Sequence, residues 1–370
     1  MVIQKKTCAL AIAVALAAGT SLLVATREDP SAAPAEPAYL ANDSHVHLTN
    51  YVQVGTDIHD FLRTMDGKIG RAVLFGIPLQ QMWSYRLSQE DAPTYYLDSD
   101  APLYYYSFTD AAIAMAFRSL SPRDRARFDP MITGFNPADM YAADHVRRVL
   151  LTYPGVFEGI GEFSIHKEFV TSKVAGGAPS LEDPALDRLL SFAEEVGLVV
   201  LVHCDADTPF PQPGATPAYL AGLRALFERH PRTTIIWAHI GVGRVVRPIK
   251  DHMELVDRAM DAPELRHVMV DLSWAEVAKY VVASPEAVKT VAAVIEHHPD
   301  RFLFGTDEVA PKNQREYLRV YEMYEPLWRQ LSPRARELVL RGNYERIFDQ
   351  ARHRVRAWEE AHKGSTPSAD

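Results

Sequence analysis

The sequence predicts an α/β protein built as a (β/α)8 TIM barrel. After about residue 38, short apolar runs alternate with longer amphipathic segments, which is typical of a parallel sheet crossed by helices. Eight such runs occur, and a chain of 370 residues is long enough for one large barrel with insertions. No Gly-x-Gly-x-x-Gly loop follows the first run, which disfavours an open, doubly wound sheet.

The eight apolar runs are predicted as the barrel strands. They span residues 41–47, 71–77, 128–134, 157–163, 198–203, 233–239, 267–272 and 302–306. The predicted helices between them include residues 184–196, 217–229, 249–260 and 285–297. Several of these segments begin with proline, which suits the first turn of a helix.

The barrel is expected to be distorted by an insertion after its second strand, at about residues 78–127. This insertion is rich in tyrosine, whose side chains could line a substrate pocket, although packing against the barrel is the simpler role. Residues 331–362 are predicted as a C-terminal helical extension and residues 364–370 as a frayed tail. The barrel domain is therefore placed at residues 39–363.

The first 38 residues are predicted to lie outside the barrel. Lys5 and Lys6 precede a long apolar run, which is the order found in an export signal. Residues 1–25 are thus predicted as a signal peptide, and an uncleaved N-terminal membrane anchor is the alternative, because the run is near the lower limit for a spanning helix. Residues 26–38 form a Pro/Ala-rich linker. The protein is expected to be exported, either periplasmic or secreted, or held at a membrane by the anchor.

Composition narrows the function classes. Hydrophobic residues make up 47% and charged residues 24% of the chain, as in an ordinary soluble globular protein. The net charge of −9 gives no support to a nucleic-acid partner. The only cysteines, Cys8 and Cys204, exclude a disulfide framework and a cysteine-based zinc finger. A small-molecule substrate is expected, and the oligomeric state stays open, a homo-oligomer included.

Two histidines one residue apart, His45 and His47, mark the first predicted strand. Residues i and i+2 of a strand point to the same face, so both imidazoles are expected to point into one cavity. Imidazole is the commonest side-chain metal ligand, and two converging imidazoles can share one ion. The alternative is a pair of polar strand residues facing solvent.

Polar residues also stand where four other predicted strands end. In this fold that edge carries the active site. Each of these residues has a plainer alternative, as a helix cap or as a hydrogen-bonded core residue. Burying all of them at one rim is costly unless a cation compensates them, so a metal site is predicted. The residues are Glu162, His203, His239 and Asp307.

This motif set resembles the amidohydrolase superfamily of metal-dependent barrel hydrolases. The resemblance covers about residues 41–348, and the closing stretch 341–348 is similar to the tail of the branch that holds the amidohydrolase-related hydrolases and decarboxylases. Many members carry a carboxylated lysine on the fourth strand, where this sequence has Glu162; Lys167, further along, is not assigned that role. The motifs are Asp43-x-His45-x-His47, His203, His239 and Gly305-Thr306-Asp307.

The resemblance implies a ligand set. Glu162 would bridge two ions, with His45, His47 and Asp307 completing one site and His203 and His239 the other. If Glu162 points away, a single ion remains, and His239 would then orient a metal ligand or transfer a proton. Nitrogen and oxygen ligands without thiolate suit zinc, which is the expected metal, and also manganese, iron or cobalt.

The predicted function is a metal-dependent hydrolase. A metal-bound hydroxide would attack an ester, lactone, amide or phosphoester, and Asp307 would take up and return the proton. His239, if free, would polarise the substrate. Arg244 is expected to pair with an anionic substrate group, and His166 to reach the barrel mouth. One alternative is a non-oxidative decarboxylase of an unsaturated or aromatic acid. The other is a metal-dependent binding protein, which is disfavoured because such a protein does not need Asp307 as a base.

Overall fold

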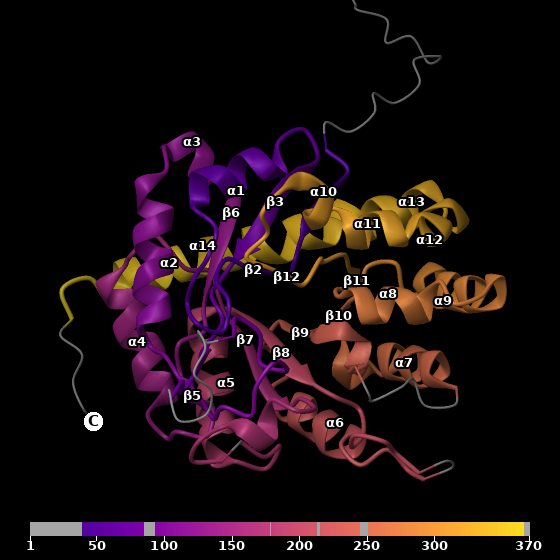
Figure 1. Ribbon diagram of the computed structural model, residues 1–370, viewed down its shortest axis with the longest axis horizontal. Helices are drawn as coiled ribbons and strands as arrows, with labels where there is room; N and C mark the ends of the chain where they lie inside the picture. Colours follow the sequence, from indigo (N-terminus) through magenta and orange to yellow (C-terminus); the bar gives the residue numbers. More distant parts are fainter. Residues whose placement is uncertain (1–38, 85–92, 178, 213–214, 245–250, 366–370) are drawn as a thin grey trace, which may run out of the picture. The chain divides into compact units, whose positions relative to one another are not determined.

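A computed structural model describes residues 39–84, 93–177, 179–212, 215–244 and 251–365. At its centre lies an eight-stranded parallel sheet, and each strand is hydrogen-bonded to the strand that precedes it around the barrel (Figure 1). In order across the sheet, the strands are β1 (Ala41–Asp43), β3 (Ile69–Leu74), β6 (Phe128–Ile132), β7 (Gly159–His166), β8 (Val199–Cys204), β9 (Ile235–Trp237), β10 (Val268–Asp271) and β11 (Phe302–Leu303).

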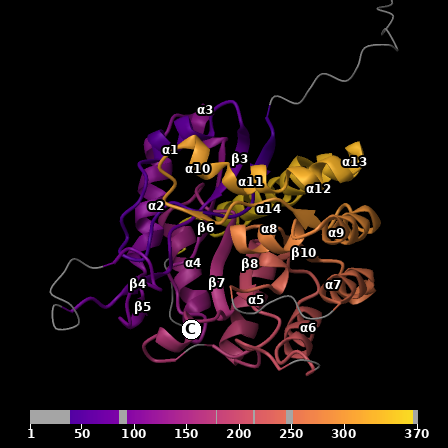
Figure 2. The ribbon, with the colours of Figure 1, turned by 45° about the vertical axis from the view of Figure 1, so that its right-hand side comes forward.

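A helix follows every strand of this sheet, which confirms the predicted (β/α)8 barrel. The helices form an outer layer, seen from two directions in Figures 1 and 2. The helices that connect consecutive strands are α1 (Ile58–Met65), α2 (Phe108–Ser119), α4 (Ala142–Thr152), α5 (Pro184–Val196), α6 (Leu220–Arg229), α7 (His252–Asp261) and the pair α8 (Ala275–Val281) and α9 (Pro285–His297).

Helix boundaries follow the capping residues in the sequence. Asp183 accepts a hydrogen bond from the backbone of Ala185 at the start of α5, and Pro184 takes the first helical position. The helix ends at Gly197, whose φ of 87° is the left-handed conformation that glycine adopts without strain. Because these signals are local, α5 and α9 begin and end where the sequence predicts.

The barrel closes next to its first and last strands. The backbone N–H of Ser44 donates to the Phe304 carbonyl at 3.0 Å, and the Ser44 hydroxyl donates to the same oxygen at 2.9 Å. Two short strands continue this seam, β2 (Val46–His47) and β12 (Glu308–Val309), which pair in parallel. The first strand is therefore not continuous over residues 41–47 as predicted. The Asp43 carboxylate accepts hydrogen bonds from the backbone N–H groups of His45 and Thr306, both at 3.0 Å. These side-chain hydrogen bonds take the place of backbone pairing between strands at this point.

The predicted insertion and C-terminal extension are both present. The insertion contains the antiparallel pair β4 (Leu79–Gln81) and β5 (Leu103–Tyr105) before α2 and α3 (Pro122–Arg125). The C-terminal elements are α10 (Gln314–Tyr317), α11 (Arg319–Met323), α12 (Glu325–Gln330), α13 (Pro333–Glu337), the π-helix η4 (Leu338–Gly342) and α14 (Asn343–Ala361). Elsewhere in the described residues lie the 3-10 helices η1 (Thr171–Lys173), η2 (Ala238–Gly241) and η3 (Pro263–Leu265).

Residues 38–370 form one compact unit. The predicted signal peptide or anchor (1–25), the linker (26–38) and positions 366–370 of the predicted tail lie outside the described residues. Within the described residues, no helix combines the length and the apolar character that a membrane crossing requires.

Candidate metal centre

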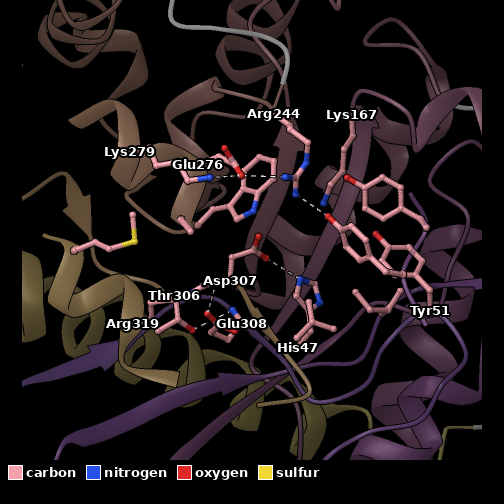
Figure 3. A pocket seen from close by; sticks show the side chains of 17 residues that line it. His47, Tyr51, Lys167, Arg244, Glu276, Lys279, Thr306, Asp307, Glu308 and Arg319 are labelled. Atoms are coloured by element: carbon pink, nitrogen blue, oxygen red, sulfur yellow. Dashed lines mark hydrogen bonds and ion pairs between the residues drawn. The ribbon is translucent and has the colours of Figure 1, made fainter. Parts of the chain in front are cut away.

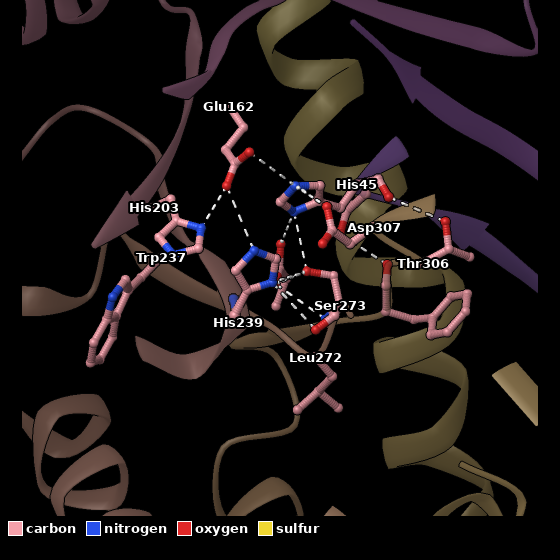
Figure 4. A network of polar contacts seen from close by, with 12 residues as sticks. His45, Glu162, His203, Trp237, His239, Leu272, Ser273, Thr306 and Asp307 are labelled. Carbon is pink, nitrogen blue, oxygen red and sulfur yellow. Dashed lines mark hydrogen bonds and ion pairs between the residues drawn. The ribbon is translucent and has the colours of Figure 1, made fainter. Parts of the chain in front are cut away.

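Four imidazoles and two carboxylates meet at the carboxyl end of the barrel strands. Figure 4 labels five of these residues, and Figure 3 labels His47 beside Asp307. Five of the six are buried, and Asp307 is partly exposed, with 11% of its side chain accessible. They come from six different places in the barrel: His45 after β1, His47 in β2, Glu162 in β7, His203 in β8, His239 in η2 after β9, and Asp307 between β11 and β12.

Glu162 lies between two pairs of imidazoles. Its Oε2 is 3.8 Å from His45 Nε2 and 3.4 Å from His47 Nε2. Its Oε1 is 2.7 Å from His203 Nδ1 and 3.6 Å from His239 Nε2. Asp307 Oδ1 joins the first pair, 3.3 Å from the Nε2 atoms of both His45 and His47. The structure thus brings together all six predicted residues around Glu162.

The donor set fits a divalent ion. His45 Nε2 and His239 Nε2 are buried and have no hydrogen-bond partner among the described residues. A buried polar nitrogen without a partner is costly, and a shared cation would satisfy both atoms. Imidazole nitrogens and carboxylate oxygens without thiolate are ligands for zinc and for the neighbouring divalent metals.

Two glycines allow the ligands to approach one another. A Cβ on Gly161, which has φ 109°, would clash with the backbone of Leu201 on the next strand, so only glycine can precede Glu162 here. A Cβ on Gly305 would press against His45 and Ser273. His239 and Asp307 themselves have left-handed backbones, with φ of 57° and 53°. Such conformations in residues other than glycine are often found at functional sites.

A cavity of about 360 Å³ opens beside His47 and Asp307 (Figure 3). Tyr51, Tyr95 and Tyr96 line it, and Arg244 lies beside Tyr95. This arrangement shows that tyrosines of the insertion line the cavity.

Arg244 is fixed by its neighbours in the cavity wall. Its Nη2 donates to the Tyr95 hydroxyl at 2.8 Å, its Nη1 lies 3.0 Å from Glu276 Oε1, and its guanidinium lies over the Trp274 ring. Its Nε is buried without a hydrogen-bond partner among the described residues. Arg244 therefore stands where the sequence reasoning expects a substrate-binding residue.

His166 does not line this cavity. Its ring stacks on Tyr219, with ring centroids 3.7 Å apart. The pairing of β7 with β8 shifts register between Ser164 and His166, and such a shift changes the face to which the following side chains point. The predicted substrate-binding role of His166 is corrected accordingly, because its side chain does not line the cavity. Its neighbour Lys167 lines the cavity instead.

A sequence model of the amidohydrolase family matches residues 165–350, just over half of the chain. The chain belongs to the amidohydrolase family. The curated proteins compared with it include no match.

Solved structures resemble this chain at low identity. A Pseudomonas putida protein assigned as a 2-pyrone-4,6-dicarboxylic acid hydrolase is 15% identical, with a TM-score of 0.50 over 84% of this chain and 98% of that one. An amidohydrolase from Burkholderia multivorans, solved with bound zinc, is 15% identical, with a TM-score of 0.49 over 84% and 99% of the two chains. Dihydroorotase from Campylobacter jejuni is 16% identical, with a TM-score of 0.48 over 84% of each chain.

In this amidohydrolase, Asp271 and Ser273 hold two of the imidazoles, and the sequence reasoning missed both residues. Asp271 Oδ2 is 3.0 Å from His45 Nδ1, and its Oδ1 accepts from the His239 backbone N–H at 2.7 Å. The Ser273 hydroxyl lies 2.8 Å from His239 Nδ1. A proton on His45 Nδ1, donated to Asp271, leaves the Nε2 lone pair pointing into the centre. The signal was present, since Asp271 lies at the end of the seventh apolar run and Ser273 follows that run.

Lys167 is a third residue that the sequence reasoning left out of the centre. Its Nζ lies 3.2 Å and 3.4 Å from the two oxygens of Glu162. Burial alone would raise the pKa of Glu162, but the charge of Lys167 and the hydrogen bond from His203 lower it well below its usual value. Burial likewise would lower the pKa of Lys167, but Glu162 raises it well above its usual value. Both groups are therefore charged at neutral pH.

The histidines of the second pair favour the neutral form. Burial lowers the pKa of both His203 and His239 below its usual value. A neutral imidazole has a free lone pair, which is the form that binds metal. His203 is also oriented by Asp205, whose Oδ1 lies 3.1 Å from its Nε2.

Proposed function

We propose that this amidohydrolase is a metal-dependent hydrolase that cleaves an ester, lactone, amide or phosphoester bond in a small molecule. One observation supports the proposal most directly. Unpartnered nitrogens of His45 and His239 point toward Glu162 and Asp307, next to a cavity large enough for a small substrate.

The ligands of the ion would be His45, His47, Glu162 and Asp307, with His203 and His239 available for a second ion. Zinc is the expected metal, and manganese, iron and cobalt suit the same donors. A divalent ion bound there would lower the pKa of its water from ~15.7 to ~7 and polarise a substrate oxygen.

Asp307 is the residue that we propose as proton carrier. Burial would raise its pKa, but the neighbouring imidazoles of His45 and His47 lower it well below its usual range. Its carboxylate is therefore ionised at neutral pH and can accept a proton from the attacking water. Since Asp307 also lines the cavity, it can deliver that proton to the leaving group.

The cavity wall supports a substrate with several hydrogen-bond acceptors. Arg244 Nε and the Tyr96 hydroxyl are buried and unpartnered among the described residues, and both residues line the cavity. A carboxylate, phosphate or carbonyl group of the substrate would satisfy these two donors. Arg244→Met is therefore expected to raise KM more than it lowers kcat.

Non-oxidative decarboxylation is the second candidate. The contact between the Lys167 ammonium and Glu162 favours this alternative. Two bridged metal ions would need both carboxylate oxygens of Glu162, and Lys167 already contacts both. The contact therefore favours a single ion. A single ion is enough to bind a carboxylic acid substrate. The two functions differ in their products, since only the lyase releases CO2.

The deciding experiment measures both products with one preparation. The purified chain is loaded with zinc or manganese, its metal content is determined, and it is incubated with lactones, phosphoesters, amides and aromatic acids. Acid or phosphate release that disappears after chelation and returns with metal supports the hydrolase. Release of CO2 in place of hydrolysis, or a chain that binds no metal, would overturn it.

We also propose that residues 1–25 direct export, with the barrel outside the cytoplasm or tethered to a membrane. The order of basic start, apolar run and Pro/Ala-rich linker supports this. Fractionation of cells that express the full chain, compared with a chain that starts at residue 39, tests it.

A further inference from the structure

A second group of ligand-type side chains lies on the outer layer, where α7 packs beside α9 (Figures 1 and 2). Asp257 and Asp261 are one turn apart on α7, so both carboxylates point to the same side of that helix. His297 and His298 stand at the end of α9 and face them. This group shares no residue with the centre at the barrel mouth.

The four side chains converge on one point. Asp257 Oδ1 is 2.9 Å from His297 Nδ1 and 3.0 Å from His298 Nε2. Asp261 Oδ1 is 3.7 Å from His298 Nε2 and 3.8 Å from His297 Nε2. Ligands held 2.0–2.2 Å from a tetrahedral zinc ion lie about 3.3 Å from one another, so these spacings need only small adjustments to hold an ion.

The charges of the group also favour a cation. Among the ion pairs of the described residues, Asp257 and Asp261 contact histidines only, and no lysine or arginine neutralises them. The two imidazole rings lie side by side, with centroids 4.1 Å apart, and both face the carboxylates. His298 is largely buried, so its imidazole is held in place. Asp261 is more than half exposed, so an ion can reach the group from solvent.

We propose that Asp257, Asp261, His297 and His298 form a surface site for a transition-metal ion that links α7 to α9. Two imidazoles with two carboxylates select zinc or copper over magnesium or calcium, which prefer oxygen ligands alone. Because the ligands come from two helices, the ion stabilises the folded chain by mass action. The site is independent of the proposed hydrolase activity.

The test is zinc binding to the whole chain. Wild type is compared with Asp261→Asn, which alters an exposed side chain, and with the double variant His297→Ala/His298→Ala. His353→Ala, at an exposed position of α14, is the matched control. We expect both site variants to bind one equivalent of zinc less than wild type and to lose part of the rise in Tm that zinc produces. The control should match wild type.

A second measurement separates this site from the centre. In His45→Ala, which is expected to lose the ion at the barrel mouth, added Cu²⁺ should still give an electron paramagnetic resonance spectrum with nitrogen hyperfine coupling. That coupling should weaken when His297→Ala/His298→Ala is added, because only the imidazoles left at the barrel mouth then remain to bind Cu²⁺. Zinc stoichiometry and a Cu²⁺ spectrum that do not change in the site variants would overturn the proposal.

Discussion

The ammonium of Lys167 lies 3.2 Å and 3.4 Å from the two carboxylate oxygens of Glu162, in the middle of the predicted metal ligands. Both side chains are almost fully buried. The pair therefore places a fixed positive charge on the one carboxylate that faces both pairs of imidazoles. Glu162 has less negative charge to offer a second metal ion than it would have alone.

Removing that charge should increase metal binding. We expect Lys167→Met to retain more zinc per chain than wild type after the same dialysis, as measured by elemental analysis. Without metal the variant should be less stable, because loss of one partner of a buried ion pair costs about 3–5 kcal/mol. Lys279→Met, at the rim of the cavity, is the control. Metal content equal to or below wild type would contradict this reading of Lys167.

Asp307→Asn should remove the proton carrier with little change of backbone. Asparagine tolerates the left-handed conformation that Asp307 adopts, with φ 53°, so the substitution isolates the charge. We expect turnover to fall by ~10²–10⁴-fold, the scale of a general acid-base group. Glu308→Gln, at the neighbouring position paired with Arg319, serves as the control. Turnover near wild type in Asp307→Asn would remove Asp307 from the proposed mechanism.

His45 and His166 provide a matched pair of histidines near the barrel mouth. His45→Ala deletes an imidazole that faces both carboxylates of the centre, so bound metal and activity should both be lost. His166→Ala deletes an imidazole that stacks on Tyr219 outside the cavity, so metal content should be unchanged. Elemental analysis of both proteins checks the contrast. Equal metal content in the two variants would argue against His45 as a ligand.

A buried histidine outside the centre should make the fold sensitive to acid. His252 is 3% exposed, and its Nε2 lies 2.8 Å from the Ile240 carbonyl oxygen. Burial lowers its pKa below the usual 6.5, so below that pH the unfolded chain binds a proton that the folded chain refuses. Stability is then lost as pH falls below about 6.5, by at most about 1.4 kcal/mol per pH unit.

His252→Gln should reduce this loss, because glutamine can donate to the Ile240 carbonyl without titrating. Urea unfolding of both proteins between pH 7.5 and 5.5 measures the difference. Parallel pH dependence in the two proteins would show that His252 does not carry the effect.

Much of the site could be predicted because strand ends are visible in the sequence. His203, His239 and Asp307 each stand where an apolar run stops, and the fold brings such positions to one edge. Asp271 has the same signal and could have been found in the same way. The insertion was also visible, but its sequence did not show which tyrosines line the cavity.

The sequence by itself determined the barrel, the bounds of α5 and α9, and the identity of the six ligand-type residues, because periodicity, helix-start signals and residue chemistry are local properties. Only the tertiary structure decided that Lys167 enters the centre and His166 leaves it. That outcome depends on the register shift between β7 and β8. A shift of one position turns every following side chain to the opposite face, and no pattern within a single strand specifies it.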